Sequence, residues 1–272
     1  MFLNRLYKYK RPATDAENQK SGQLLIRFEK GEWIIRIAAE DNDIIALEWL
    51  ETGEFLDEQT MQSYLEKFLK GLLYDSDNVH LVICGEQFQF MPSGFTSENE
   101  EWAVLLNNVD NSADRLITEP FDAESKIELI YTVPESLIRI LNTVVGKFNI
   151  THQAALYYQE NSAEFTREAV NVCLYKNYAL VQAIINHETF FLKRINWKTQ
   201  EDLLFEIMSI YKHFSMEPHE IPLYTGGMIT KDSPVFNLLM RYIKEVEIKQ
   251  FKSFQILSQL PDLHESHLIE KV

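Results

Sequence analysis

Residues 170–197 read VNVCLYKNYALVQAIINHETFFLKRINW, and this stretch decides the fold. Runs rich in β-branched and aromatic residues are broken only by short turns, at Tyr175-Lys176-Asn177 and at Asn186-His187-Glu188. Such runs favour extended chain, and such turns connect neighbouring strands. The stretch therefore predicts three consecutive strands, a β-meander.

An earlier stretch matches this one residue for residue without a gap. Residues 24–51 read LLIRFEKGEWIIRIAAEDNDIIALEWLE, with turns at 29–31 and 40–42. Phe28 aligns with Leu174 and Lys30 with Lys176, and each pair is 146 positions apart. The same meander is therefore predicted twice.

The parallel continues after each meander. Residues 59–73 and 200–214 place apolar side chains on one face at helical spacing. A short apolar strand follows each helix, 79–84 ending at Gly85 and 221–225 ending at Gly226-Gly227. Two copies of so long a unit indicate a duplicated domain, because a solenoid needs several short repeats.

We therefore predict an α/β fold with two lobes, each a mixed sheet with flanking helices. The predicted boundaries are a basic arm and linker at 1–22, a first lobe at 23–118, a second lobe at 119–257 and a polar tail at 258–272. The remaining elements are predicted as a helix after the acidic residues 98–101, extended segments at 115–118 and 126–133, a helix at 135–148 opened by Pro134, a strand at 154–158, a helix at 235–243 capped by Ser233 and a last strand at 246–250.

Composition restricts the possible functions. The chain has 272 residues, enough for two lobes with their own cores. Its formal net charge of −15 disfavours non-specific nucleic-acid binding, which needs a basic surface. The acidic runs 40–43 and 98–101 are expected to be solvated loops.

Cys84 and Cys173 lie inside predicted strands and are expected to be free, buried thiols. No apolar run is long enough to span a membrane, and residues 1–12 lack the apolar centre of a signal peptide, so we expect a cytoplasmic protein. Four cations in the first eleven residues could contact an anionic membrane or a partner. We favour instead an arm that is frayed or folded back onto the protein's own acidic surface.

These features together resemble the actin, Hsp70 and sugar-kinase superfamily of duplicated ribonuclease-H-like domains. More narrowly, nearly the whole chain is similar to an uncharacterised bacterial family described as having an actin-like ATPase fold. The resemblance is carried by the order and spacing of 90–95, the acidic segment after it, 130–134, 152–158, the 170–197 meander and Leu223-Tyr-Thr-Gly-Gly227.

The resemblance implies ATP with magnesium between the lobes, held in part by an Asp-x-Gly loop in each first hairpin. The first hairpin here reads Glu29-Lys30-Gly31-Glu32, and the second reads Tyr175-Lys176-Asn177-Tyr178. Neither has the aspartate that would organise magnesium. If a nucleotide binds, the residues that we expect to contact it are Lys30, Lys176, Gly226 and Gly227. The alternative is that the lysines are exposed turn residues and that the glycines serve a strand-to-helix turn.

We predict no catalytic or metal-binding residues. The sequence has no nucleophile elbow, Walker loop or zinc-type cysteine pairing, and His264 and His267 are too few ligands for a metal. His80, His152 and His187 are interpreted as structural histidines.

Two functions remain open. The favoured one is a non-catalytic actin-like scaffold that binds an unidentified protein, as actin-like components of pilus and secretion machines hold a peptide from a membrane partner. The alternative is an ATP-binding enzyme or nucleotide-dependent switch. A homodimer joined through an exposed sheet edge is a third possibility.

Overall fold

The computed structural model describes residues 4–10, 22–39, 44–52, 57–70, 72, 74–93, 114–121, 127–162, 167–186 and 188–249. The chain divides into two compact units, residues Met1–Ala155 and Leu156–Val272. The predicted boundary at 118/119 falls inside strand β7 (Asp114–Pro120), which pairs with β8 (Ile127–Pro134). Because these two strands belong to one sheet, the division lies later in the chain than the sequence indicated.

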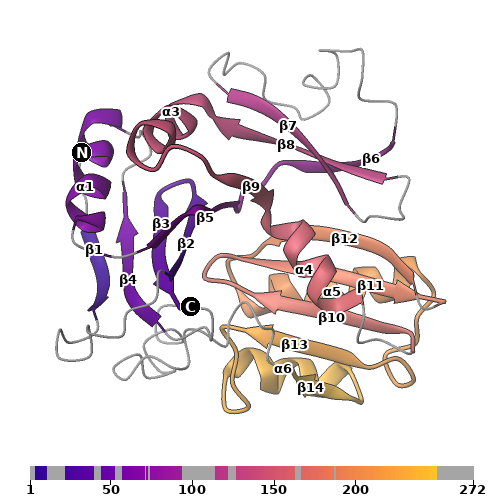
Figure 1. Ribbon diagram of the computed structural model, residues 1–272. Coiled ribbons are helices and arrows are strands. Elements are labelled where there is room, and N and C mark those ends of the chain that lie inside the picture. Colours follow the sequence, from indigo (N-terminus) through magenta and orange to yellow (C-terminus); the bar gives the residue numbers. More distant parts are fainter. Residues whose placement is uncertain are drawn as a thin grey trace. The chain divides into compact units, whose positions relative to one another are not determined.

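The first predicted meander forms the centre of a six-stranded sheet in the first unit (Figure 1). Strands β2 (Gly22–Glu29), β3 (Glu32–Ala38) and β4 (Ile44–Glu51) are antiparallel neighbours, as predicted. Strand β5 (Tyr74–Ile83) runs parallel to β2, and the short β9 (Asn149–His152) runs parallel to β5. The strand order is β1-β4-β3-β2-β5-β9, so β9 is an edge strand.

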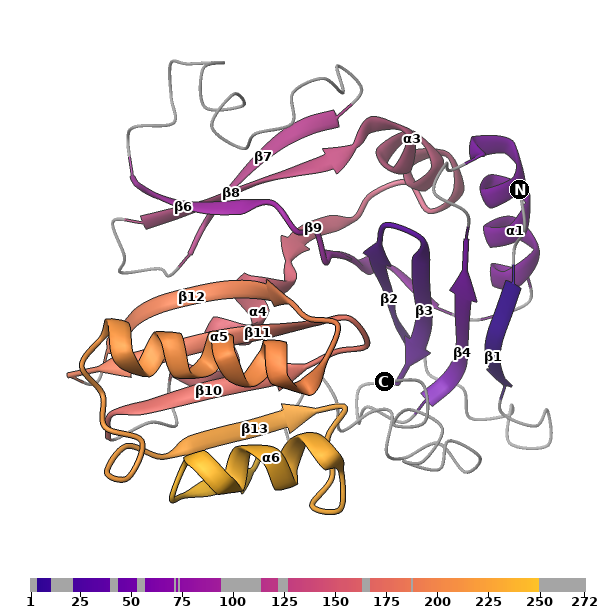
Figure 2. The ribbon, with the colours of Figure 1, turned by 180° about the vertical axis from the view of Figure 1, so that it is seen from behind.

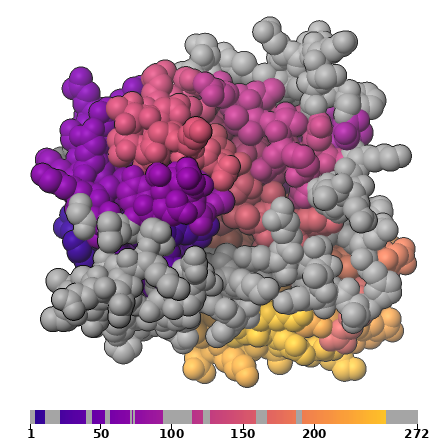
Figure 3. Space-filling model, viewed as in Figure 1, coloured from indigo at the N-terminus to yellow at the C-terminus, as the bar shows by residue number. Residues whose placement is uncertain are grey.

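Two helices complete the core of this unit, α1 (Glu58–Leu69) and α3 (Glu135–Val144). Helix α1 buries Met61, Leu65 and Leu69, which are four residues apart and so lie on one face. The two helices contact each other, and in the space-filling view the violet atoms around α1 adjoin the rose atoms around α3 (Figure 3). Each large apolar side chain buried here contributes roughly 2 kcal/mol to folding.

A second, three-stranded sheet also belongs to the first unit. Strand β6 (Phe88–Pro92) and β7 both pair antiparallel with the central β8. Strand β8 buries Leu129, Ile130, Tyr131 and Val133, and its last residue, Pro134, leads directly into α3. The second sheet is therefore joined to the helical layer by a single residue.

Within the basic arm, the described residues 4–10 form an edge strand of seven residues. Strand β1 (Asn4–Lys10) pairs antiparallel with β4. Lys8 Nζ lies 2.8 Å from the carboxylate of Glu48, which is 1% exposed. The arm thus folds back onto an acidic group of its own unit, which was one of the outcomes expected from the sequence.

The second predicted meander forms the sheet of the second unit. Strands β10 (Ala169–Leu174), β11 (Tyr178–Ile185) and β12 (Glu188–Asn196) are antiparallel neighbours, and β13 (Leu223–Gly227) runs parallel to β10. Strand β14 (Val246–Ile248) pairs with β13 and completes the five-stranded sheet. This order repeats the order of the central strands in the first unit, as a duplicated domain requires.

Helices α5 (Gln200–His213) and α6 (Pro234–Tyr242) cover the same face of this sheet (Figure 2). Thr199 and Asp202 form a capping box at the start of α5, and the Ser233 hydroxyl accepts from the Phe236 N–H at the start of α6. Their apolar faces pack on β10, β11 and β13 in one core cluster. Both helices and the Ser233-Pro234 start of α6 were predicted correctly.

One predicted element was wrong. Residues 154–158 are not a strand but belong to helix α4 (Gln153–Ser162). Cys84 and Cys173 are buried and are not joined in a disulfide, as predicted. The helix expected after residues 98–101, the acidic runs themselves, the linker 13–21, His187 and the tail with His264 and His267 lie outside the described residues.

Candidate functional site

The first hairpin turn, at Lys30 and Gly31, carries an ion-pair cluster. The Arg27 guanidinium lies 3.4 Å from the carboxylates of both Glu29 and Glu32. Gly31 has a φ of +87°, which glycine adopts without strain, and its carbonyl accepts from the Thr52 N–H at 2.8 Å. The turn therefore presents two carboxylates that already share one cation.

Lys30 is exposed at the tip of this turn, on the side of Asp114. Burial raises the pKa of the Asp114 carboxyl above its ordinary value, and the positive charge of Lys30 opposes that rise. Lys30, which was predicted to contact an anionic ligand, thus interacts electrostatically with a carboxylate of its own unit.

The second hairpin turn is filled by aromatic rings. The rings of Tyr175 and Tyr178 are stacked, with centroids 4.5 Å apart and planes 8° apart. The Tyr175 N–H donates to the Tyr178 carbonyl at 2.8 Å, and the Arg194 guanidinium lies 3.6 Å from the Tyr178 ring centroid. Both tyrosines are buried. The residues on either side of Lys176 and Asn177 are therefore packed aromatic side chains and not polar groups that could bind a phosphate.

Gly226 and Gly227 lie at the same end of the sheet as this turn. Strand β13 pairs with β10 so that Gly226 is opposite Cys173 and Gly227 is opposite Leu174, two residues before Lys176. Gly227 has a φ of +80°, and a Cβ atom there would overlap the backbone of Leu174. The structure thus brings Lys176 and the two glycines together within the second unit, whereas Lys30 belongs to the first. Their role toward a nucleotide stays a prediction.

The described part of the chain contains no group of three or more His, Cys, Asp or Glu residues that could hold a metal ion. His152 is buried beside Phe88 and Tyr131, with ring centroids 4.7 and 5.0 Å away. Its Nδ1 accepts from the Ala154 N–H at 3.1 Å, which matches the structural role expected for it.

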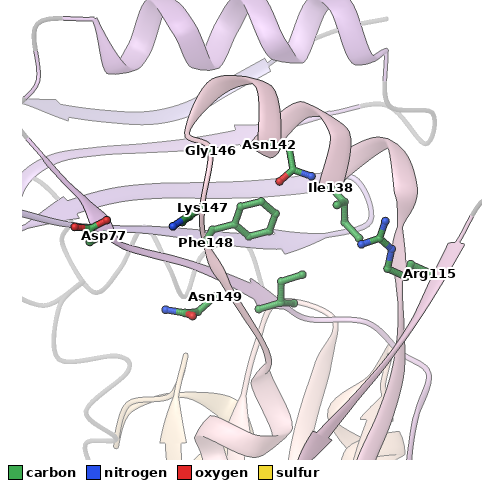
Figure 4. Close-up of a pocket in the computed structure, with 9 residues that line it drawn as sticks. Asp77, Arg115, Ile138, Asn142, Gly146, Lys147, Phe148 and Asn149 are labelled. Carbon is green, nitrogen blue, oxygen red and sulfur yellow. The ribbon is translucent and has the colours of Figure 1, made fainter.

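A pocket of about 510 Å³ lies within the first unit (Figure 4). Its apolar part is formed by Ile138 of α3, Phe148 and Ile150 of β9, and its polar rim by side chains from four parts of the chain: Asp77, Arg115, Asn142, Lys147 and Asn149. An apolar floor with a few polar groups around it is the usual composition of a ligand-binding pocket.

The end of α3 places the pocket residues. The N–H groups of Val145 and Gly146 both donate to the Leu141 carbonyl, at 2.9 and 3.2 Å, and Gly146 has a φ of +79°. A glycine in this conformation ends a helix and turns the chain away from the helix axis. The chain then passes through Lys147 and Phe148 into β9, so both side chains reach the pocket.

The polar rim is mostly unpaired. Arg115 donates to both Glu135 oxygens, at 2.7 and 3.0 Å, and is the exception. Within the described residues, the side chains of Asp77, Asn142, Lys147 and Asn149 have no hydrogen-bond or ion-pair partner. The pocket therefore offers an amide pair, a cation and an anion to a ligand.

The outer edge of β9 adjoins this pocket. The His152 N–H donates outward to Glu119 of β7 at 2.8 Å, and the Thr151 hydroxyl donates to the same oxygen at 3.3 Å. Burial raises the pKa of Glu119, and these two hydrogen bonds oppose the rise. Because backbone N–H groups alternate along a strand, the N–H of Ile150 faces the same edge as that of His152.

The sequence did not predict this pocket. Its residues come from β5, β7, α3, β9 and the segment between α3 and β9. Neither the charge nor the periodicity of any one of these segments identifies them as pocket residues. The one local signal is Gly146 after an amphipathic helix, which predicts where the helix ends but not what lies beyond.

Duplicated meanders, each followed by a helix and a parallel strand, define the actin-like ATPase fold. A Bacteroides thetaiotaomicron protein with this fold and unknown function aligns with a TM-score of 0.67 and 16% identity, over 90% of this chain and 98% of that one. The PilM–PilN type IV pilus biogenesis complex aligns with a TM-score of 0.55 and 12% identity, over 93% of this chain and 97% of the matched one. The predicted fold is confirmed.

The sequence matches the DUF3822 family, described as a protein of unknown function, over residues 11–246, and the chain belongs to this family. No curated protein matches the sequence. In the described part of the chain, every helix is too short or too polar to cross a membrane.

Proposed function

We propose that this chain is a non-catalytic scaffold with an actin-like fold that binds a segment of a partner protein. The observation that carries the proposal is the chemistry of the two hairpin turns, where the superfamily resemblance implies phosphate-binding loops. Glu29 and Glu32 bring two carboxylates to the first turn, and a stacked tyrosine pair fills the second.

These side chains fit a magnesium nucleotide poorly. A triphosphate needs backbone N–H groups, cations and a magnesium-binding carboxylate with free oxygens. At the first turn the Arg27 cation is shared by the two glutamates, so both are held in ion pairs. At the second turn no carboxylate is present in the sequence between Tyr175 and Tyr178.

The pocket of the first unit is the proposed contact site for the partner. Its floor of Ile138, Phe148 and Ile150 can bury an apolar side chain, and the unpaired rim groups can bond to a peptide backbone. PilM, whose structure in complex with PilN has a similar fold, provides the analogy for a protein partner. The pathway of the present chain is not implied by that analogy.

The test is a comparison of proteins captured from native cytoplasm. The pocket variant Lys147→Glu/Asn142→Arg changes two exposed side chains that have no partner among the described residues, so its fold should be retained. The matched control, Lys231→Glu/Asn237→Arg, makes the same changes at exposed positions of the second unit. We expect a partner that binds the wild-type protein and the control but not the pocket variant, and direct titration with that purified partner should repeat the difference. Equal binding to all three proteins would place the contact elsewhere.

The second candidate is a nucleotide-dependent switch. It is favoured by one observation, the position of Gly226 and Gly227 at the sheet end that also carries Lys176. A ligand that binds only the folded state raises the melting temperature as its concentration passes the dissociation constant. A saturable shift with millimolar ATP and magnesium that is lost in Lys176→Ala would support this candidate over the scaffold.

A further inference from the structure

A second depression, of about 620 Å³, lies between β1 and the first three turns of α1, on a different part of the first unit. Its lining contains two cations and four neutral polar side chains, with no carboxylate: Arg5, Gln59, Thr60, Ser63, Tyr64 and Lys67. In a chain with a formal net charge of −15, such a lining is a local departure from the average surface.

The charges around the depression do not balance. Glu48 is the buried carboxylate behind it, and Lys8 lies 2.8 Å from its Oε1. Arg5 lies 3.6 Å from the same oxygen and donates to the Tyr64 hydroxyl at 3.3 Å, and Tyr64 donates in turn to Glu48. The Glu48 carboxylate therefore faces two cations of β1, and Lys67 adds a third positive charge. The other carboxylate in contact with the lining is Asp57, which accepts from the Thr60 hydroxyl at 2.5 Å, so three cations meet two carboxylates.

Donors on α1 are also unused. Gln59, Ser63 and Lys67 are four residues apart and so line one side of the helix. The described residues provide no hydrogen-bond or ion-pair partner for any of these three side chains. The depression includes the first turn of α1, where the helix dipole favours negative charge.

We propose that this depression binds a phosphate group. The Arg5 guanidinium from β1, together with the Lys67 ammonium and the Ser63 hydroxyl from α1, supplies several charge-assisted donors, which suits an oxyanion with three or more acceptor oxygens. The volume lies in the range of small-molecule sites, so a phosphate ester of a small molecule fits as well as the free ion. Arg5 precedes residues 11–246, so part of the site lies outside the segment that matches the family.

The test uses inorganic phosphate and glycerol 3-phosphate as probes, titrated into the full chain by calorimetry at constant ionic strength with sodium chloride. Lys67→Gln removes one cation from the depression without touching the Glu48 cluster. Lys70→Gln is the matched control, since Lys70 is exposed at the C-cap of the same helix but does not line the depression.

We expect saturable binding of at least one probe to the wild-type chain and to Lys70→Gln with equal dissociation constants. Loss of one charge-assisted contact should weaken binding to Lys67→Gln about tenfold. Tighter binding of the ester than of the free ion would identify an ester as the ligand, and the reverse would identify free phosphate. The proposal is overturned if neither probe binds, or if Lys67→Gln binds as tightly as the control. Either result is independent of partner capture at the other pocket.

Discussion

Gly227 lies so close to Leu174 that a Cβ atom on the glycine would overlap the leucine carbonyl oxygen. The Met228 N–H donates to that same carbonyl at 2.9 Å, which fixes the end of β13 against β10. Gly227 is therefore required by the packing of two strands, whether or not a ligand approaches it.

Substitution of Gly227 should report on the fold. Gly227→Ala combines a left-handed φ with a backbone overlap, and we expect it to lower the free energy of unfolding by more than about 3 kcal/mol. Gly146→Ala is the control, because it has a similar φ but open space around its Cβ position, and it should cost only about 1 kcal/mol. Urea unfolding followed by circular dichroism measures both, and equal losses would contradict the packing argument.

The ion pair between Lys8 and Glu48 should stabilise the attachment of β1. Lys8 is half exposed and Glu48 is buried, so removal of the lysine leaves a carboxylate without its nearest counter-ion. We expect Lys8→Met to destabilise the protein by about 1 to 3 kcal/mol, between the values for exposed and buried pairs.

The control for this pair is Lys10→Met, an exposed cation of the same strand, which should change stability by less than about 0.5 kcal/mol. In a double-mutant cycle, Glu48→Gln should remove most of the effect of Lys8→Met. Additive effects of the two changes would show that the pair contributes nothing.

Arg36 of β3 should destabilise the sheet in which it lies. It is 6% exposed, burial lowers its pKa to about 10, and its Nε has no hydrogen-bond partner among the described residues. Because the folded state holds this proton less tightly than the unfolded state, the cost is full at neutral pH and declines only as the pH rises through 10.

Arg36→Met should therefore raise the free energy of unfolding by about 1 kcal/mol or more at about neutral pH. Arg241→Met, at an exposed position of α6, is the control and should be close to neutral in effect. A loss of stability in Arg36→Met would indicate that the guanidinium has a partner in the native protein.

Glu119 should make the stability of the protein depend on pH. Burial raises its pKa in the folded state, so the folded chain binds this proton more tightly than the unfolded chain. Its contribution is therefore most favourable below the ordinary carboxyl pKa and is lost as the pH rises through the higher, folded pKa.

In Glu119→Gln the acceptor oxygen for the His152 N–H is kept and the titration is removed. We expect this variant to lose less stability than the wild-type protein between pH 4 and neutral pH, a window of about three units above the ordinary carboxyl pKa. Urea midpoints at several pH values measure the slope, with Glu247→Gln, an exposed position, as the control. An unchanged slope in Glu119→Gln would contradict the burial argument.

The sequence predicted the repeated parts of the fold because their signals are local. The two meanders show β-branched runs and short turns, and Ser233-Pro234 marks the start of α6. Residues 154–158 were mispredicted because Ala-Ala-Leu-Tyr-Tyr is a short apolar run, and such a run has no period that separates a buried strand from a buried helix.

The candidate sites were beyond prediction for a different reason. Asp77, Arg115 and Lys147 meet at one pocket only because β5, β7 and the end of α3 are neighbours in space. The partner of Lys8 is forty positions away in the chain, at Glu48. A family resemblance pointed to the turn residues Lys30, Lys176, Gly226 and Gly227. The ion pairs and stacked rings around them depend on side-chain contacts in the folded chain, which the sequence pattern does not reveal.

The most direct test of the central claim is calorimetric titration of the full chain with ATP and magnesium. A scaffold whose hairpin turns hold Glu29 and Glu32 in ion pairs and stack Tyr175 on Tyr178 should give, at millimolar nucleotide, no saturable heat that Lys176→Ala removes. Saturable binding that is lost in Lys176→Ala, while the melting temperature without nucleotide is unchanged, would contradict the account.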